Sequence, residues 1–180
     1  MFSMSSKLTA ENIDLLSSLR TGIGFDSHRF SDNRKLVLGG VEIDYSFGLQ
    51  GHSDADVVIH AIIDSLLSAA GEGDIGKLFP DTDPAYKNIN SLELLSRVCK
   101  ILKKKSVIII NVDTVVICEA PKIGPYIDSM KKKLSDALGG LPVSRIGIKG
   151  KTTEKMGFTG RREGIAVQAV SLISLSENFT

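Results

Sequence analysis

The sequence predicts a two-layer α/β (α+β) sandwich in which three helices lie on one face of a mixed sheet of four to five strands. Two long apolar runs, residues 107–117 and 165–175, have the composition of strands, and the first of them is rich in β-branched residues. Three other segments carry apolar residues at helical spacing. A length of 180 residues with 42% apolar content suits one domain with a single hydrophobic core.

The first part of the body is predicted to be extended. Residues 21–29 have the composition of a strand. Residues 35–43 predict two short strand pieces on either side of Gly39 and Gly40, because paired glycines are typical of a turn or bulge.

The first helix is predicted from apolar side chains that recur every four residues. It is expected to begin near Ser53 and Asp54, whose short polar side chains are good N-caps, and to end at Gly71 and Gly73. The residues that repeat along the apolar face are Val58, Ile62 and Leu66.

The second part of the chain alternates helices and strands. The loop "GDIGKLFPDTDPAYK", which contains two prolines, precedes the second helix, and the loop "GKTTEKMGFTGRREG" joins the last two strands. The predicted elements are, in order, a helix over 91–104, a strand over 107–117, a helix over 125–138 stopped by Gly139 and Gly140, a strand over 146–149 and a strand over 165–175.

Residues 1–20 are Ser-rich and polar, and they predict a loosely ordered extension before a single domain of residues 21–180. They lack the apolar stretch of a secretory signal, and no run reaches the roughly 18 apolar residues of a membrane span. The net charge of +1 gives no reason to expect nucleic acid as a partner. Cys99 and Cys118 fit neither a zinc spacing nor a disulfide framework, so the cytoplasm is the expected compartment.

The motif "GFDSHRF" suggests part of a metal site. Residues two apart on a strand share a face, so Asp26 and His28 are expected to project together. His60 lies on a helix that should pack on the sheet, and one carboxylate with two imidazoles would bind Zn²⁺ and leave its fourth position open. The spacing alone also fits a loop hydrogen bond from Asp26 with histidines that are scattered singly.

Three further stretches carry polar groups at loops or helix starts. "GHSDADVVIH" places His52 and Ser53 at a predicted helix N-terminus, which attracts anions. "GDIGKLFPDTD" has acidic residues that turn chemistry alone would explain. "GKTTEKMGFTGR" offers cations, hydroxyls and a carboxylate to a polyphosphate and its Mg²⁺. Neither a Walker A motif nor G-x-G-x-x-G is present, so a standard nucleotide-binding fold is not indicated.

Over roughly residues 21–175 the chain resembles the 2-C-methyl-D-erythritol 2,4-cyclodiphosphate synthase family. The resemblance rests on "GIGFDSHRF", "LGGVEIDYSFGLQGHSDADVVIHAIIDSLL", "GDIGKLFPDTDP", "NVDTVVICEAPKIGPYI" and "KTTEKMGFTGRREGIA", which occur in the family's order. It implies a homotrimer with active sites at the subunit interfaces. It also implies Zn²⁺ or another divalent transition metal, with Mg²⁺ or Mn²⁺ on the substrate diphosphate.

The resemblance also implies residue roles. Asp26, His28 and His60 match the zinc ligands, Glu154 matches a Mg²⁺ ligand, and His52 and Thr152 match groups that stabilise the transition state. The implied substrate contacts are Asp26, Ser27, His28, His52, Ser53, Asp74, Ile75, Gly76, Phe79, Pro80, Asp81, Thr82, Asp83, Cys118, Glu119, Ala120, Pro121, Lys122, Ile123, Gly124, Lys151, Thr152, Thr153, Glu154, Phe158 and Arg161. Two positions depart from the family pattern. Lys151 replaces a threonine, and Ala55 stands where glycine is common, a change expected to be harmless within a helix start.

The implied reaction belongs to the non-mevalonate (MEP) route of isoprene biosynthesis. In 4-diphosphocytidyl-2-C-methyl-D-erythritol 2-phosphate, the 2-phosphate attacks the β-phosphorus, CMP leaves, and a cyclic diphosphate forms. Two alternatives remain at this stage: a zinc-dependent diphosphate hydrolase with the same ligands, and a non-catalytic module that binds isoprenoid diphosphates. A bacterial cytoplasm is expected, and a plastid-type organelle also fits the resemblance.

Overall fold

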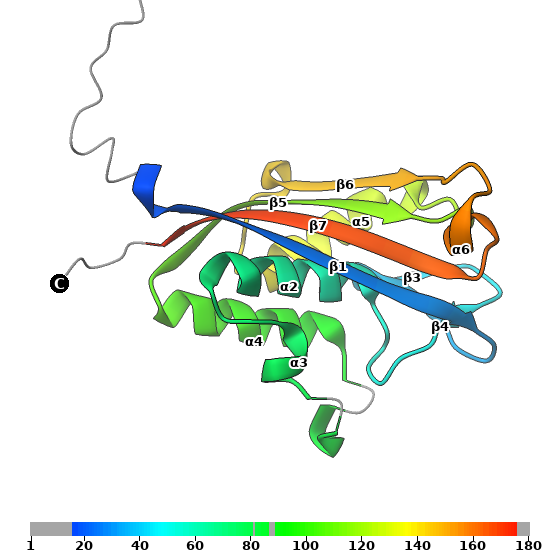
Figure 1. Ribbon diagram of the computed structural model, residues 1–180, viewed down its shortest axis with the longest axis horizontal. Helices are drawn as coiled ribbons and strands as arrows, with labels where there is room; N and C mark the ends of the chain where they lie inside the picture. The colour runs from blue at the N-terminus through cyan, green and yellow to red at the C-terminus, as the bar shows by residue number, and fades with distance from the viewer. Residues whose placement is uncertain (1–15, 81, 87–88, 176–180) are drawn as a thin grey trace, which may run out of the picture.

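The computed structural model describes residues 16–80, 82–86 and 89–175 (Figure 1). Among these residues the main sheet has five strands in the order β4-β1-β7-β5-β6, and β2 and β3 form a separate hairpin. The strands are β1 (Leu19–Ser31), β2 (Leu36–Leu38), β3 (Val41–Ile43), β4 (Gly48–Leu49), β5 (Val107–Ile117), β6 (Ile146–Lys151) and β7 (Gly164–Leu175).

The main sheet is mixed, as predicted. β1 pairs antiparallel with β7 along almost its whole length, from Leu19 opposite Ser174 to Arg29 opposite Gly164. β7 pairs antiparallel with β5, and β5 pairs parallel with β6. The parallel pair requires a crossover, and the chain between β5 and β6 supplies one that contains a helix.

The helices pack against the sheet and against one another, and Figure 1 shows α2 and α4 together below it. The α-helices are α2 (Val57–Ala70), α3 (Ile75–Leu78), α4 (Ser91–Lys104), α5 (Ile127–Ala137) and α6 (Gly157–Gly160). Short 3₁₀ helices cover Pro84–Tyr86, Gly124–Tyr126 and Val143–Arg145. None of the helices in the described part of the chain is long and apolar enough to cross a membrane.

α2 fills the centre of the core and lies unusually close to β1. A Cβ atom added at Gly22 would stand 2.0 Å from the Ser65 carbonyl oxygen, and one added at Gly24 would stand 2.0 Å from the Ala61 carbonyl oxygen. Only glycine leaves room for a helix backbone at this distance from a strand. The two glycines therefore fix how near α2 comes to the even-numbered side chains of β1.

The predicted start of the first helix is wrong by a few residues. The N-cap is Asp56, whose carboxylate accepts hydrogen bonds from the backbone N–H groups of Val58 and Ile59. Asp54 is used elsewhere, because its carboxylate accepts from the backbone N–H of Ser91 at the start of α4. The predicted end is right, since Gly71 is the C-cap with a φ of 72°.

The other boundaries agree closely with the sequence. The helix over 91–104 and the strand over 107–117 have the predicted limits. β6 runs two residues further than predicted, and α5 begins at Ile127 because a 3₁₀ turn precedes it. β1 takes in residues 19 and 20, which had been assigned to the extension, and residues 1–15 lie outside the described residues.

Candidate active site

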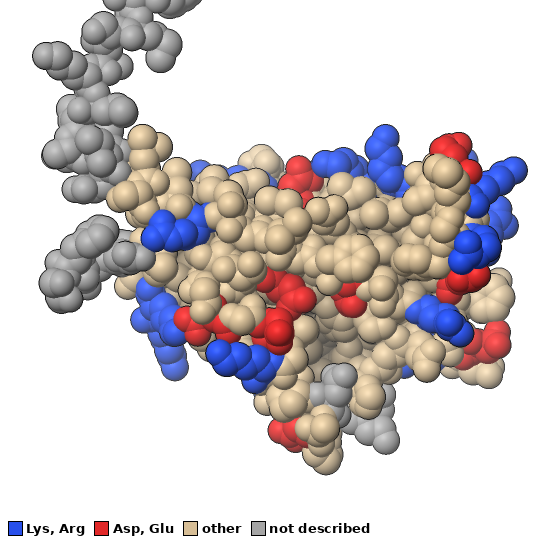
Figure 2. All heavy atoms as spheres, in the orientation of Figure 1, with Lys and Arg blue, Asp and Glu red and all other residues tan. Residues whose placement is uncertain are grey.

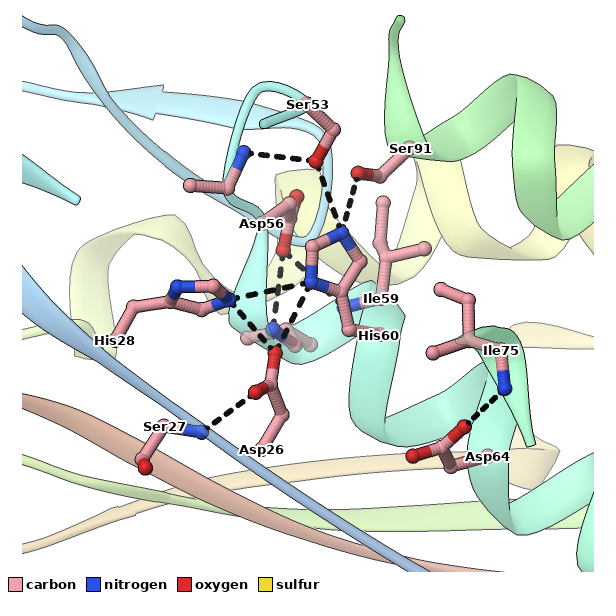
Figure 3. A network of polar contacts seen from close by, with 12 residues as sticks. Asp26, Ser27, His28, Ser53, Asp56, Ile59, His60, Asp64, Ile75 and Ser91 are labelled. Carbon is pink, nitrogen blue, oxygen red and sulfur yellow. Dashed lines mark hydrogen bonds and ion pairs between the residues drawn. The ribbon is translucent and has the colours of Figure 1, made fainter. Parts of the chain in front are cut away.

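Asp26, His28 and His60 meet between β1 and α2 (Figure 3). One ligand atom from each of the three lies within 4.8 Å of the other two. Asp26 Oδ2 is 3.0 Å from His28 Nε2 and 3.0 Å from His60 Nδ1. Asp26 and His28 share the face of β1 that carries Gly22 and Gly24, so the close approach of α2 brings His60 to them.

The second nitrogen of each ring also has a partner. His28 Nδ1 lies 2.6 Å from the carbonyl oxygen of Gln50, so it donates to that oxygen and leaves Nε2 to face Asp26. His60 Nε2 lies 3.1 Å from Ser53 Oγ and 3.0 Å from Ser91 Oγ. The other carboxylate oxygen of Asp26 accepts from the backbone N–H of Ser27 at 2.7 Å.

The electrostatics of the cluster favour a carboxylate beside cationic groups. Burial acts to raise the pKa of Asp26, but hydrogen bonds from His28 and His60 and their charges hold it well below its ordinary value. Burial acts to lower the pKa of His28, and the hydrogen bond and charge of Asp26 outweigh it, so the pKa is raised. A divalent cation bound here would take the place of the ring protons that His28 and His60 direct at the Asp26 carboxylate.

A cavity of about 310 Å³ opens beside the three side chains. Figure 2 shows this face of the molecule hollowed below the sheet, with acidic side chains near the hollow. Besides the three candidate ligands, the predicted site residues that line the cavity are His52, Ser53, Ile75, Gly76 and Phe79. Asp64, Tyr86, Ile89 and Leu94 also line it and were not predicted. Burial raises the pKa of Asp64, which accepts from the backbone N–H of Ile75 at 2.8 Å.

The loop that carries His52 and Ser53 is held by two charged side chains that the sequence did not single out, the half-buried Arg34 and the buried Asp56. The guanidinium of Arg34 donates to the carbonyl oxygens of Gly51 and Ser53, at 2.5 and 2.6 Å. Asp56, fully buried, accepts from the backbone N–H groups of the β2–β3 turn in addition to those of its own helix. The loop is thereby tied to Arg34 and to the β2–β3 turn.

Ala55 was expected to lie within a helix start, and that expectation is wrong. It lies before the helix with a φ of 58°, in the left-handed region where glycine is favoured. The alanine therefore carries a backbone cost that the glycine of other sequences would not.

The predicted residues near the end of β5 gather in a second cavity of about 370 Å³. Its lining includes Cys118, Glu119, Pro121, Lys122, Ile123, Gly124, Lys151 and Thr152, and it shares no lining residue with the first cavity. Within one chain the predicted site thus divides into two parts. Burial, with a smaller effect of the neighbouring Glu119 charge, raises the pKa of Cys118 to about 11, so its thiol is not a nucleophile at neutral pH.

The turn at the edge of this second cavity is fixed by a carboxylate. Glu119 Oε1 accepts from the backbone N–H groups of Thr153 and Lys155, both at 3.0 Å. Thr152 is exposed, and its hydroxyl donates to Glu154 Oε1 at 2.5 Å, a bond within its own turn. The Thr153 hydroxyl instead donates to the carbonyl oxygen of Met156, and Thr153 is half-buried.

The remaining predicted residues lie outside both cavities. Ser27 and Phe158 line a third, smaller hollow of about 220 Å³, because Ser27 is on the face of β1 opposite Asp26. Arg161 is exposed and pairs with Glu163, at 2.8 Å. Asp74 caps α3 by accepting from the backbone N–H of Lys77.

The loop after α3 holds the last of the predicted contacts. Pro80 and Thr82 are exposed, and Asp83 accepts from the backbone N–H of Ala85. Ala120 lies between two lining residues of the second cavity. Asp81 lies outside the described residues.

The sequence profile of the YgbB family matches residues 19–174, which is most of the chain and all of the main sheet except the last residue of β7. The chain belongs to the YgbB family.

Curated relatives of this chain include enzymes named 2-C-methyl-D-erythritol 2,4-cyclodiphosphate synthase. The chain is 55% identical to the 2-C-methyl-D-erythritol 2,4-cyclodiphosphate synthase of Caldicellulosiruptor bescii over 154 residues, which is 86% of this chain and 98% of that protein. The IspF of Plasmodium falciparum, solved as a CDP complex, matches with a TM-score of 0.77 and 36% identity, over 89% of this chain and 98% of that one. The bifunctional IspDF of Campylobacter jejuni matches with a TM-score of 0.83 and 43% identity, over 87% of this chain and 42% of that longer one.

Proposed function

We propose that this protein is a cyclising phosphorus–oxygen lyase of the non-mevalonate isoprenoid pathway. It converts 4-diphosphocytidyl-2-C-methyl-D-erythritol 2-phosphate to 2-C-methyl-D-erythritol 2,4-cyclodiphosphate and CMP. The observation that carries this proposal is the identity of 55% to a curated synthase over 98% of its length. The meeting of Asp26, His28 and His60 beside a cavity supports it.

The three side chains fit a zinc ion. A carboxylate oxygen and two imidazole nitrogens are ordinary Zn²⁺ donors, and three protein ligands leave one position for the substrate. The bound ion would supply Lewis acidity and orient the reacting phosphate. Glu154, exposed beside Lys151 and Thr152, is the proposed ligand of a Mg²⁺ on the diphosphate.

The chain's own residues bind and fold the substrate. The attacking phosphate is already ionised near neutral pH, so the reaction needs no strong base, and ring closure depends on positioning and on neutralising charge. His52 and Ser53 line the first cavity, where they can donate hydrogen bonds to the attacking phosphate or to the phosphate that leaves with CMP. The Thr152 hydroxyl, held by Glu154, would turn to a phosphate oxygen when a cation occupies that carboxylate.

Charge supports an active site shared between subunits. Asp26 and Asp64 line the first cavity, and no Lys or Arg lines it within the described ranges. A substrate with several phosphates needs cations there. The second cavity has Lys122 and Lys151, and it belongs to another part of the surface. In a homotrimer the second cavity of one copy would face the first cavity of its neighbour.

The sheet offers a surface for such an assembly. Ile23 and Phe25 on β1 are each 59% exposed, and Val170, opposite Ile23 on β7, is 43% exposed. They point away from the face of β1 that packs on α2. Exposed apolar side chains grouped in this way are typical of an interface between subunits. Cys99 and Cys118 are free thiols, which is consistent with a protein that functions in a reducing cytoplasm.

The decisive experiment follows the phosphorus atoms. We expect the diphosphocytidyl substrate with Zn²⁺ and Mg²⁺ to give equimolar CMP and a cyclic diphosphate by phosphorus NMR. A linear phosphate product would instead identify a hydrolase, and tight binding without turnover would identify a binding module. Light scattering should give about three times 19.4 kDa. A monomer with full activity would refute the shared site.

A further inference from the structure

His60 has partners at both of its ring nitrogens. Its Nδ1 faces Asp26, and its Nε2 lies 3.1 Å from Ser53 Oγ and 3.0 Å from Ser91 Oγ. Ser91, the first residue of α4, is fully buried, so its hydroxyl exchanges with no water. A buried hydroxyl at this position must take part in a defined hydrogen-bond arrangement.

The direction of that arrangement is set by Asp54. Its Oδ1 lies 2.5 Å from Ser91 Oγ, and its Oδ2 accepts from the backbone N–H of Ser91 at 3.0 Å. An ionised carboxylate only accepts hydrogen bonds, so the proton of the Ser91 hydroxyl points to Asp54. The lone pairs of Ser91 Oγ are then left for His60, whose Nε2 must be the donor.

We infer that Asp54 and Ser91 are positioning residues that hold His60 as a metal ligand. They form a relay from carboxylate to hydroxyl to imidazole, in which the proton of His60 resides on Nε2. A metal ion would displace the Nδ1 proton that faces Asp26 in the metal-free protein, and the proton held on Nε2 then leaves the Nδ1 lone pair to bind the ion between His60, Asp26 and His28. The inference rests on the proposed function in one respect, the metal ion at these three side chains.

The relay also decides what Ser53 can do. Ser53 Oγ accepts from the backbone N–H of Ala55 at 3.1 Å. Because Nε2 of His60 carries a proton, it does not accept one from Ser53. The hydroxyl proton of Ser53, which lines the cavity, therefore remains available to a phosphate oxygen. Asp54 and Ser91 thus orient the candidate metal ligand and keep a substrate donor free.

The fold holds the relay rigidly. Asp54 donates its own backbone N–H to the carbonyl oxygen of Ile89, at 3.2 Å, so the loop before α2 is bound to the start of α4 at several points. Ser91 cannot move from His60 without breaking the bond of its N–H to Asp54.

The test measures zinc affinity by competition with a chelator, without substrate. We expect Ser91→Ala to weaken zinc binding roughly 10- to 100-fold, which is typical when a metal ligand loses the group that hydrogen-bonds it. Ser91→Thr keeps the hydroxyl and should recover most of the affinity. The matched control is Ser65→Ala, because Ser65 is equally buried in α2 but donates to the carbonyl oxygen of Ile62. Its zinc affinity should equal that of the native protein.

A spectroscopic signature separates positioning from general stability. In the zinc-loaded native protein, the Nε2–H proton of His60 should be resolved and slow to exchange in nitrogen-correlated NMR. It should broaden in Ser91→Ala, and in Asp54→Asn if the alanine variant does not fold. Native zinc affinity together with a slowly exchanging proton in these variants would overturn the relay. Full zinc content in His60→Ala would instead refute the metal site itself, so the two failures are distinguishable.

Discussion

Gly24→Ala tests whether the closeness of α2 to β1 creates the candidate metal site. The added Cβ would stand 2.0 Å from the Ala61 carbonyl oxygen and 2.7 Å from the Ser65 backbone nitrogen. Ordinary contact begins at 3.4 Å, so the helix must retreat by 3.4 minus 2.0, about 1.4 Å. His60 precedes Ala61, and its Nδ1 would move from 3.0 Å to roughly 4 Å from Asp26 Oδ2.

That displacement has two measurable consequences. Metal–ligand distances tolerate only about 0.2 Å, so we expect zinc affinity to fall by about 100-fold or more. Overpacking of the core should cost about 3 kcal/mol of the free energy of unfolding. Zinc competition and urea unfolding of the metal-free protein measure the two effects separately.

Two further glycines provide controls. Gly22→Ala makes an equally close contact, 2.0 Å from the Ser65 carbonyl oxygen, but more than one helical turn beyond His60. It should destabilise the protein to a similar degree and weaken zinc binding less. At Gly124 an added Cβ meets nothing within 4 Å, so Gly124→Ala should leave both quantities unchanged. Native zinc affinity in Gly24→Ala would show that the helix spacing does not build the site.

Three other substitutions test polar side chains, two of them at the loop before α2 and one in the core of the sheet. Burial raises the pKa of Asp56 to about 6, so its stabilising contribution is full below the unfolded pKa and is lost as pH rises through about 6. Asp56→Asn does not titrate and serves as the reference. Relative to this variant, the free energy of unfolding of the native protein, measured in urea, should fall by up to about 3 kcal/mol between about pH 4 and 7. A rise would mean that the four backbone N–H donors to Asp56 keep its carboxylate ionised. Ser171 Oγ is buried with no hydrogen-bond partner among the described residues, so Ser171→Ala should be neutral or stabilising by about 1 kcal/mol in the same assay. Arg34→Met frees the carbonyl oxygens of Gly51 and Ser53, so KM should rise roughly tenfold while zinc content stays full. Unchanged kinetics would contradict the role given to Arg34 in holding this loop.

Only part of the metal triad followed from periodicity. Alternation along a strand puts Asp26 and His28 on one face. The spacing alone left His60 open as a single scattered histidine, and the family resemblance was needed to add it to the ligand set. The distance between strand and helix was not predictable in the same way. It follows from Gly22 and Gly24, whose role appears only when the two backbones are placed against each other.

The helix start shows why local signals fail at the site. "SDAD" contains three residues able to cap a helix, and local preference does not choose among them. The choice is tertiary. Asp56 accepts from the N–H groups of Gly39 and Gly40 in the β2–β3 turn, and Asp54 is taken by Ser91 on α4. Partners 15 to 40 residues away along the chain are outside what a short window of sequence reveals.

The loop between β4 and α2 is held by three parts of the fold. Arg34 binds its carbonyl oxygens, Asp56 binds the neighbouring hairpin, and Asp54 binds the start of α4. These hydrogen bonds join the loop to three other segments of the chain and so fix where His52 and Ser53 lie. The loop also accepts a left-handed Ala55, a cost that the surrounding hydrogen bonds must outweigh. A substrate that reaches this cavity therefore meets donors that are already oriented, which is the condition under which electrostatic stabilisation of a transition state requires least rearrangement.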